Sequence, residues 1–339
     1  MKANQLLFER LGPVCSSEEL ADLQAKFSQY SPAYVNVCAS INVRNATACL
    51  EDWWKEFQPY ADHNFCTEIK TDFFQRCWEL YLGITLLRRN FILTAHGERF
   101  PDFDVKHPLT GDRLTWIEAV AVKKGTTVDK VPDMILGEAA DVPEEQMLLR
   151  LATALDGKQE QYHSRLERGV CSPDEAYVIA VNSAELGHPD AEMPLILKAL
   201  FGIGHLTLEL SVSDAPTEIV DSFWSPRPTV SKQNNEPVGM GFFRDPSNAG
   251  ISAIFYCTSH IFNSPHLPEE MGENIVVVHN PLAINALPEG AFPFGAEYRA
   301  IENGVEKIRE RNEYRSMYGD LIRYPYVLPG RREKRDSVT

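Results

Sequence analysis

The sequence predicts a mixed α/β fold in which a central sheet lies between flanking helices, and three observations support this prediction. Residues 66–89 are apolar on almost every side of a helical pattern, which is typical of a buried helix. Strand-like segments separated by turn residues follow at 90–95, 101–105 and 113–122. A second helical pattern at 144–168 then precedes the apolar run "AYVIAVN" (176–182), which suits a strand buried on both faces.

The 339 residues divide by pattern into three regions. Residues 1–62 are predicted to be a helical N-terminal region. Residues 63–190 hold the first helix, the three-strand meander, the second helix and the fourth strand. Residues 191–339 are predicted to be a mixed α/β extension, and the sequence leaves open whether it is continuous with the core.

The extension contains one helical segment and two apolar strands, at 193–204, 251–259 and 274–281. Residues 297–323 are predicted to form a strand followed by a charged helix. No linker rich in Gly, Ser or Pro marks a domain boundary, and no repeat of fixed period is present.

The composition is that of a globular protein, because 44% of the residues are apolar and 24% are charged. The first residues lack the apolar core of a signal peptide, and no apolar run approaches the ~18 residues of a membrane span. We therefore expect a cytoplasmic protein with no membrane partner. Seven scattered cysteines without a C-x-x-C pair predict reduced thiols, and nine scattered histidines argue against a dedicated zinc site.

The formal net charge of -15 argues against a surface devoted to nonspecific nucleic-acid binding, because neutralising phosphates requires Lys and Arg. It does not exclude a local basic groove. The candidate pieces are Arg88 with Arg89, Lys123 with Lys124, and the segment 330–335. The alternative interpretation of each is an ordinary solvated surface charge.

Two carboxylates stand in segments that otherwise have the pattern of buried strands: Asp102 in "PDFDV" and Glu118 in "WIEAVAV". Alternate residues of a strand face the same side, so Glu118 shares a face with Trp116 and Val120. If the two segments are hairpin partners, Asp102 and Glu118 can lie side by side. Adjacent buried carboxylates repel each other, and a hard divalent cation such as Mg²⁺ is the simplest ion that offsets this repulsion.

Glu79, a single acid inside the apolar run "CWELYL", is a third candidate from the preceding helix. It could supply a further oxygen ligand. The alternative is that these acids accept hydrogen bonds from backbone amides or pair with arginines such as Arg76 and Arg113. Three acids in consecutive apolar elements favour the metal site.

The helix at 144–168 carries a lysine on its apolar stripe. At spacings of three and four residues this stripe runs through Leu148, Leu151, Leu155, Lys158, Tyr162 and Leu166. A lysine there either extends to the edge of the core or points at a negative group, such as the clustered carboxylates or a phosphate. Gln161 lies about one turn further on, on a nearby face.

Together these residues resemble the PD-(D/E)XK nuclease superfamily, which has a restriction-endonuclease-like core. The resemblance rests on "WELY" with Glu79, "PDFDV" with Asp102, "WIEAVA" with Glu118, and the helix with Lys158 before "YVIAVN". It covers residues 66–185, about a third of the chain. It implies that Asp102, Glu118 and Glu79 bind one or two divalent metal ions, Mg²⁺ or Mn²⁺.

The resemblance also implies a lysine two residues after the second acid, which orients or activates the attacking water. Val120 stands at that position here. Lys124 has the right parity but lies about 13 Å further along a strand. Lys158 is therefore the expected replacement, because members of this superfamily are known in which the lysine has moved to that helix.

The sequence thus predicts a metal-dependent endonuclease that hydrolyses phosphodiester bonds, with DNA as the expected substrate and Glu79, Asp102, Glu118 and Lys158 as its catalytic residues. A homodimer is an expectation from the resemblance alone. One alternative is a catalytically inactive relative that serves as a binding or assembly module, which the Val120 departure favours. Another is a metal-dependent hydrolase of a small phosphoester, which a narrow closed pocket would favour.

Overall fold

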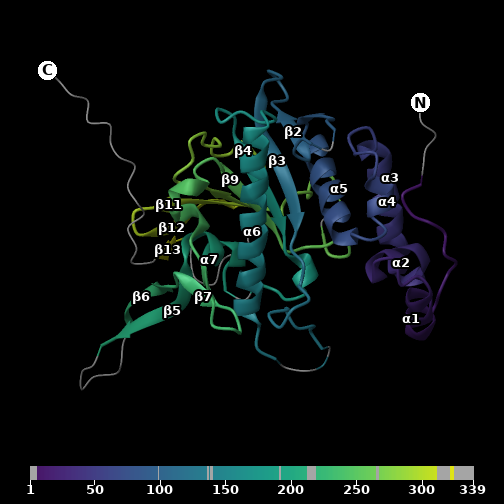
Figure 1. Ribbon diagram of the computed structural model, residues 1–339, viewed down its shortest axis with the longest axis horizontal. Helices are drawn as coiled ribbons and strands as arrows, with labels where there is room; N and C mark the ends of the chain where they lie inside the picture. The colour runs from purple at the N-terminus through teal and green to yellow at the C-terminus, as the bar shows by residue number, and fades with distance from the viewer. Residues whose placement is uncertain are drawn as a thin grey trace.

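The computed structural model describes residues 6–97, 99–135, 137, 140–190, 192–211, 219–264, 267–310 and 321–323. A mixed sheet forms its centre, and helices cover both faces of the sheet (Figure 1). The predicted α/β class with flanking helices is confirmed. No helix among the described residues is both long enough and apolar enough to span a membrane.

Nine strands of the described residues form this sheet. In spatial order they are β1 (Ile92–Thr94), β2 (Phe103–Lys106), β3 (Arg113–Ala121), β4 (Tyr177–Asn182), β9 (Ala253–Cys257), β10 (Val276–His279), β11 (Ala296–Ile301), β12 (Gly304–Glu310) and β13 (Leu321–Arg323). The first three strands are antiparallel neighbours, which confirms the predicted meander. β3, β4 and β9 are parallel. The strands from residues 253–323 therefore continue the sheet that β1 to β4 begin.

The N-terminal helices pack on one face of the sheet, at the right of Figure 1. They are α1 (Ser17–Lys26), α2 (Pro32–Ala39), α3 (Arg44–Phe57), α4 (Phe65–Glu68) and α5 (Phe73–Arg88). The single helix predicted over 66–89 is wrong, because a turn separates α4 from α5. The Thr71 hydroxyl donates to the Glu68 carbonyl, a local bond that competes with helix continuation. Within α5 the Trp78 indole N–H donates to the Ala180 carbonyl of β4 at 2.9 Å, which fixes the helix to the sheet.

Helices α6 (Glu144–Glu167) and α7 (Leu195–Phe201) cover the opposite face, where α6 crosses in front of the sheet in Figure 1. The predicted apolar stripe is present, since Leu148, Leu151, Leu155 and Tyr162 are all buried. Every residue of β4 is buried as well, as its continuous apolar run predicts. The side chains of β3 that point toward α6 therefore face a closely packed layer.

The charged helix predicted after the first strand of 297–323 is wrong for the residues that directly follow that strand. Gly304–Glu310 is strand β12, which returns along β11 after the two residues Glu302 and Asn303. Pairing with β11 therefore outweighs the helical preference of the charged residues in this strand. The remaining residues of this segment, 311–320, and the basic segment 330–335 lie outside the described residues.

Two hairpins between α7 and β9 were not predicted. β5 (Ile203–Leu210) pairs with β6 (Ile219–Pro226), and β7 (Thr229–Ser231) pairs with β8 (Pro237–Gly239). The first hairpin projects from the body of the molecule (Figure 1). The predicted helix over 193–204 is shorter than expected, because Gly202 takes a left-handed conformation that ends α7 before β5 starts.

Candidate functional site

The candidate site lies beside the first residue of β2, where the antiparallel strand β3 continues without β2 as a neighbour. The last paired residues are Phe103 and Ile117, so the backbone of β3 beyond them lacks a strand partner on that side. Side chains take its place: the Ala119 N–H donates to Asp102 Oδ2 at 2.7 Å, and the Ala121 N–H donates to Gln75 Oε1 at 2.7 Å. This satisfies the edge of β3 and leaves a gap at the surface.

The strand register places the two predicted acids beside each other. Since Phe103 pairs with Ile117, Asp102 comes opposite Glu118 one residue further along. Glu118 is 3% exposed and lies on the face of the sheet that α6 covers. The hairpin arrangement expected from the alternation is therefore present.

Helix α6 supplies two cations to Glu118. Lys158 Nζ lies 2.7 Å from Glu118 Oε1 and also donates to Gln161 Oε1 at 3.1 Å. Arg165 Nη1 donates to Glu118 Oε2 and, at 2.8 Å, to the Tyr177 hydroxyl. The predicted lysine thus points at the acid, and Arg165 was missed. Its spacing of seven residues from Lys158 places both on one helix face, and that signal could have identified it.

Glu79 enters the same region from α5 on the other side of β3. Its oxygens accept hydrogen bonds from Gln75 Nε2 at 2.8 Å and from Arg76 Nη1 at 2.6 Å. Arg76 also pairs with Asp62 and Glu68. Burial raises the pKa of Glu79, although Arg76 opposes that shift. The pairing with Arg76 is the alternative that the sequence left open for this acid.

Asp102 differs from the other two acids, because none of the described Lys or Arg side chains forms an ion pair with it. It is the exposed member of the group and opens to the solvent of the cleft. The protein atoms around the Asp102 carboxyl remove part of its hydration, and Glu118 and Glu79 repel its negative charge. Both effects raise the pKa of Asp102 well above its usual range. The positive charge of Lys158 and the hydrogen bond from the Ala119 amide oppose this rise.

These residues line one open cleft of about 450 Å³. We call it the acidic cleft, and its charged lining residues are Asp62, Glu68, Glu79, Asp102, Glu118, Arg76, Lys158 and Arg165. Carboxylates thus outnumber Lys and Arg in the described lining. An uncompensated negative charge of this kind attracts cations.

Two adjacent carboxylates, Asp102 and Glu118, are the described oxygen donors at the predicted Mg²⁺ site. No three His, Cys, Asp or Glu side chains in the described parts of the chain form a complete metal cage. Mg²⁺ seldom uses such a cage, since it usually binds one or two carboxylates and keeps waters or substrate phosphates as its other ligands. Asp102 has one oxygen on the Ala119 amide, whereas both oxygens of Glu118 pair with Lys158 and Arg165, so an ion at this pair of acids would share Glu118 with those two cations.

The other sequence candidates lie outside this arrangement. Val120 is half-buried against the α6 layer. Lys124 pairs with Asp133, and Lys123 pairs with Asp72. Arg88 pairs with Glu56, and Arg89 donates to the Met271 carbonyl. The four described residues of the predicted basic groove are therefore bonded to groups of this chain.

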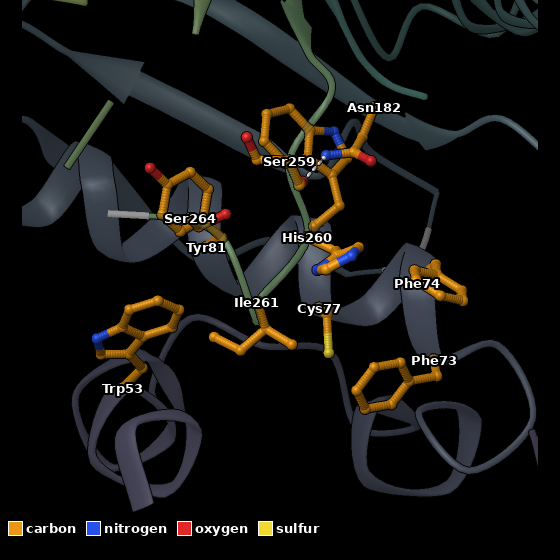
Figure 2. Close-up of a pocket in the computed structure, with 11 residues that line it drawn as sticks. Trp53, Phe73, Phe74, Cys77, Tyr81, Asn182, Ser259, His260, Ile261 and Ser264 are labelled. Atoms are coloured by element: carbon orange, nitrogen blue, oxygen red, sulfur yellow. Dashed lines mark hydrogen bonds between the residues drawn. The ribbon is translucent and has the colours of Figure 1, made fainter. Parts of the chain in front are cut away.

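A second, much smaller hollow lies between α3, α5 and the segment after β9 (Figure 2). Figure 2 shows Trp53, Phe73, Cys77 and His260 around it, with the Asn182 amide donating to the Ser259 carbonyl. Its volume of about 20 Å³ is close to that of one water. This hollow cannot hold a substrate, so the acidic cleft is the candidate site.

Comparison with known proteins assigns no family to this chain. No protein-family model matches the chain, and neither a curated protein nor a solved structure matches it. The function of the chain is therefore inferred from the residues of the acidic cleft.

Proposed function

We propose that this chain is a metal-dependent nuclease with a restriction-endonuclease-like core of the PD-(D/E)XK type. The observation that carries the proposal is the placement of Asp102 beside Glu118 on adjacent strands, with Lys158 bonded to Glu118 at 2.7 Å. The order of α5, the β1–β2–β3 meander, α6 and β4 also agrees with that core. Within this proposal the substrate is nucleic acid, in the first instance DNA, and the protein acts in the cytoplasm.

Asp102 and Glu118 would hold Mg²⁺ or Mn²⁺. When bound, such an ion supplies Lewis-acid polarisation of a phosphoryl oxygen and a lowered pKa for a coordinated water. Both oxygens of Glu79 already accept hydrogen bonds, so this acid suits the positioning of a water or of a second ion. Gln75 and Arg76 keep its carboxylate in that orientation.

Lys158 takes the catalytic role of the lysine that the PD-(D/E)XK pattern has at the position of Val120. Its amine is held by Glu118 and Gln161, which direct it into the acidic cleft. From there it stabilises negative charge that develops on the phosphate during hydrolysis. Arg165 pairs with the second Glu118 oxygen and thereby fixes the orientation of that carboxylate beside Lys158.

One observation favours an inactive binding or assembly module as a second candidate. Lys158 and Arg165 pair with both oxygens of Glu118, so this buried acid is satisfied without an ion. A module that had lost catalysis could keep such a charge network for structural reasons. Asp102 speaks against this candidate, since no described Lys or Arg forms an ion pair with it and Lys158 offsets only part of its repulsion by Glu118 and Glu79.

The deciding experiment is cleavage of plasmid and single-stranded DNA with Mg²⁺ or Mn²⁺, comparing the parent with Glu118→Gln and Lys158→Met. We expect metal-dependent cleavage by the parent and a loss of about 100-fold or more in each variant, the scale of removing one preorganised charge from a reacting site. Lys232→Met is the matched control, because Lys232 forms an exposed pair with Glu236. An inactive parent at every metal concentration would reject the nuclease and leave the binding module.

A further inference from the structure

The charges of the acidic cleft are poorly suited to a nucleic-acid duplex. A protein that follows a duplex backbone neutralises phosphates with available Lys and Arg side chains. The three Lys and Arg side chains in the described lining of the acidic cleft are all bonded to carboxylates of this chain. Affinity for a polyanion at this cleft must therefore come largely from another kind of contact.

Aromatic rings in the same lining can provide that contact. Tyr60 is half-buried in the segment between α3 and α4, and its ring lies 6.4 Å from that of Phe57. Phe100, in the loop between β1 and β2, is also half-buried and is stacked near Trp116 at 5.9 Å. The Arg99 guanidinium lies over the Phe100 ring at 5.1 Å. Rings and guanidinium planes of this kind bind unpaired bases, whose flat faces are hidden inside a duplex.

The size of the cleft agrees with this. A volume of about 450 Å³ lies in the range of pockets that enclose one small ligand. The major groove of a DNA duplex alone is about 12 Å wide, so a paired helix is far larger than this space. An unpaired strand can place a base in a space of this size, whereas the bases of a duplex are paired and stacked.

We propose that the acidic cleft acts on single-stranded nucleic acid and that Tyr60 and Phe100 stack against its bases. This inference rests on the proposed nuclease function for its catalytic part. Its binding part is independent of catalysis. Within this proposal the exposed Arg99, whose guanidinium lies over the ring of the lining residue Phe100 and forms no ion pair with a described side chain, adds one phosphate contact.

Binding and cleavage of one sequence as a single strand and as a duplex, in DNA and in RNA, tests this inference. We expect the parent to bind the single strand at least about tenfold more tightly than the duplex, and to cleave it faster. The slope of log affinity against log salt should be shallow, near the value of about -0.7 per phosphate contact for one or two contacts. The DNA and RNA arms determine which single strand is preferred.

Two variants of one residue separate stacking from packing. Tyr60→Phe keeps the ring and should bind like the parent, whereas Tyr60→Leu keeps apolar bulk without a ring. We expect Tyr60→Leu to raise KM by about tenfold with kcat almost unchanged. Phe262→Ala is the control, because Phe262 is an exposed ring that does not line the acidic cleft.

Different results would reject the single-strand inference and the proposed nuclease function. Equal binding and cleavage of duplex and single strand, or equal KM for Tyr60→Leu and Tyr60→Phe, would overturn the single-strand inference and leave the nuclease intact. Tight binding of the single strand with no cleavage at any Mg²⁺ or Mn²⁺ concentration would instead reject the nuclease and support the binding part of the inference.

Discussion

Helix α6 takes part in two ion networks that are built in opposite ways. At its start, Glu144 pairs with Lys198 of α7 and with Arg227. Lys198 is 1% exposed, and it also pairs with Glu192. In this network a buried cation forms the centre, and partly exposed carboxylates surround it.

The network of the acidic cleft reverses the roles. Here the carboxylate of Glu118 is the buried centre, and Lys158 and Arg165 of the second half of α6 surround it. Asp102 stands beside this centre without a described cation of its own. A fully paired network has no need of a further ion, whereas one with an uncompensated carboxylate attracts a ligand. A buried charge alone therefore does not indicate a ligand-binding site. A carboxylate without an ion pair in an open cleft is the stronger indication.

The largest effect should come from breaking the paired network. Lys198→Met leaves Glu144 and Glu192 without their shared amine and removes the cation from the Trp224 ring, 5.5 Å away. We expect a loss of about 3 kcal/mol in the free energy of unfolding, the low end for a broken buried pair, because both acids can regain some water. Urea unfolding measures this.

The exposed pair of Lys232 and Glu236 supplies the control. Lys232→Met should change the free energy of unfolding by less than about 0.5 kcal/mol. Equal losses in the two lysine variants would mean that the Lys198 network has no structural role beyond that of a surface pair.

The sequence predicted the parts of the fold that depend on local pattern. The meander, the α6 stripe and the buried strand β4 follow from alternation and helical spacing, and the structure has all three. The charged helix failed because β12 is held by pairing with β11, and such pairing outweighs local helical preference. The β5–β6 hairpin was not predicted either, and its two strands are likewise held by pairing with each other.

The residues of the candidate site also divide into those that the sequence predicted and those that it did not. Alternation placed Asp102 beside Glu118, and the α6 stripe placed Lys158 on the sheet. The role of Gln75 could not be predicted, since it arises only because β2 is shorter than β3 and leaves the Ala121 amide to be satisfied. Strand length relative to a neighbour is a property of the assembled sheet, and no residue near Gln75 encodes it.

The unpaired carboxylate should make stability depend on pH and on Mg²⁺. A raised carboxyl pKa means that the folded state holds the proton more tightly than the unfolded state. The free energy of unfolding of the parent should therefore fall as the pH rises through the raised pKa of Asp102, and Asp102→Asn should lack this fall. Mg²⁺ at about 100 times its Kd should add about 2.7 kcal/mol to the parent and almost nothing to Asp102→Asn.

Asp190 gives the matched control for this measurement. Burial raises its pKa to about 6, and its carboxylate accepts hydrogen bonds from Tyr256 and from the Leu195 amide, outside the acidic cleft. In thermal unfolding, Asp190→Asn should lose less stability between pH 5 and pH 8 than the parent, because the variant lacks this raised carboxyl pKa, but its gain from Mg²⁺ should be undiminished. If Asp102→Asn gains as much from Mg²⁺ as the parent does, Asp102 is not a ligand.

The smallest effect should come from moving the lysine back to the strand. Val120 lies two residues after Glu118, about 7 Å along β3 and on the same face. A lysine at 120 can therefore bring its amine near the Glu118 carboxylate once Lys158 is gone. Adding Val120→Lys to Lys158→Met should recover about tenfold in the single-turnover cleavage rate, equivalent to ~1.4 kcal/mol of transition-state stabilisation. Val120→Met in the same background matches the added length without the charge, and an equal recovery there would show that packing at position 120, and not an amine beside Glu118, limits the reaction.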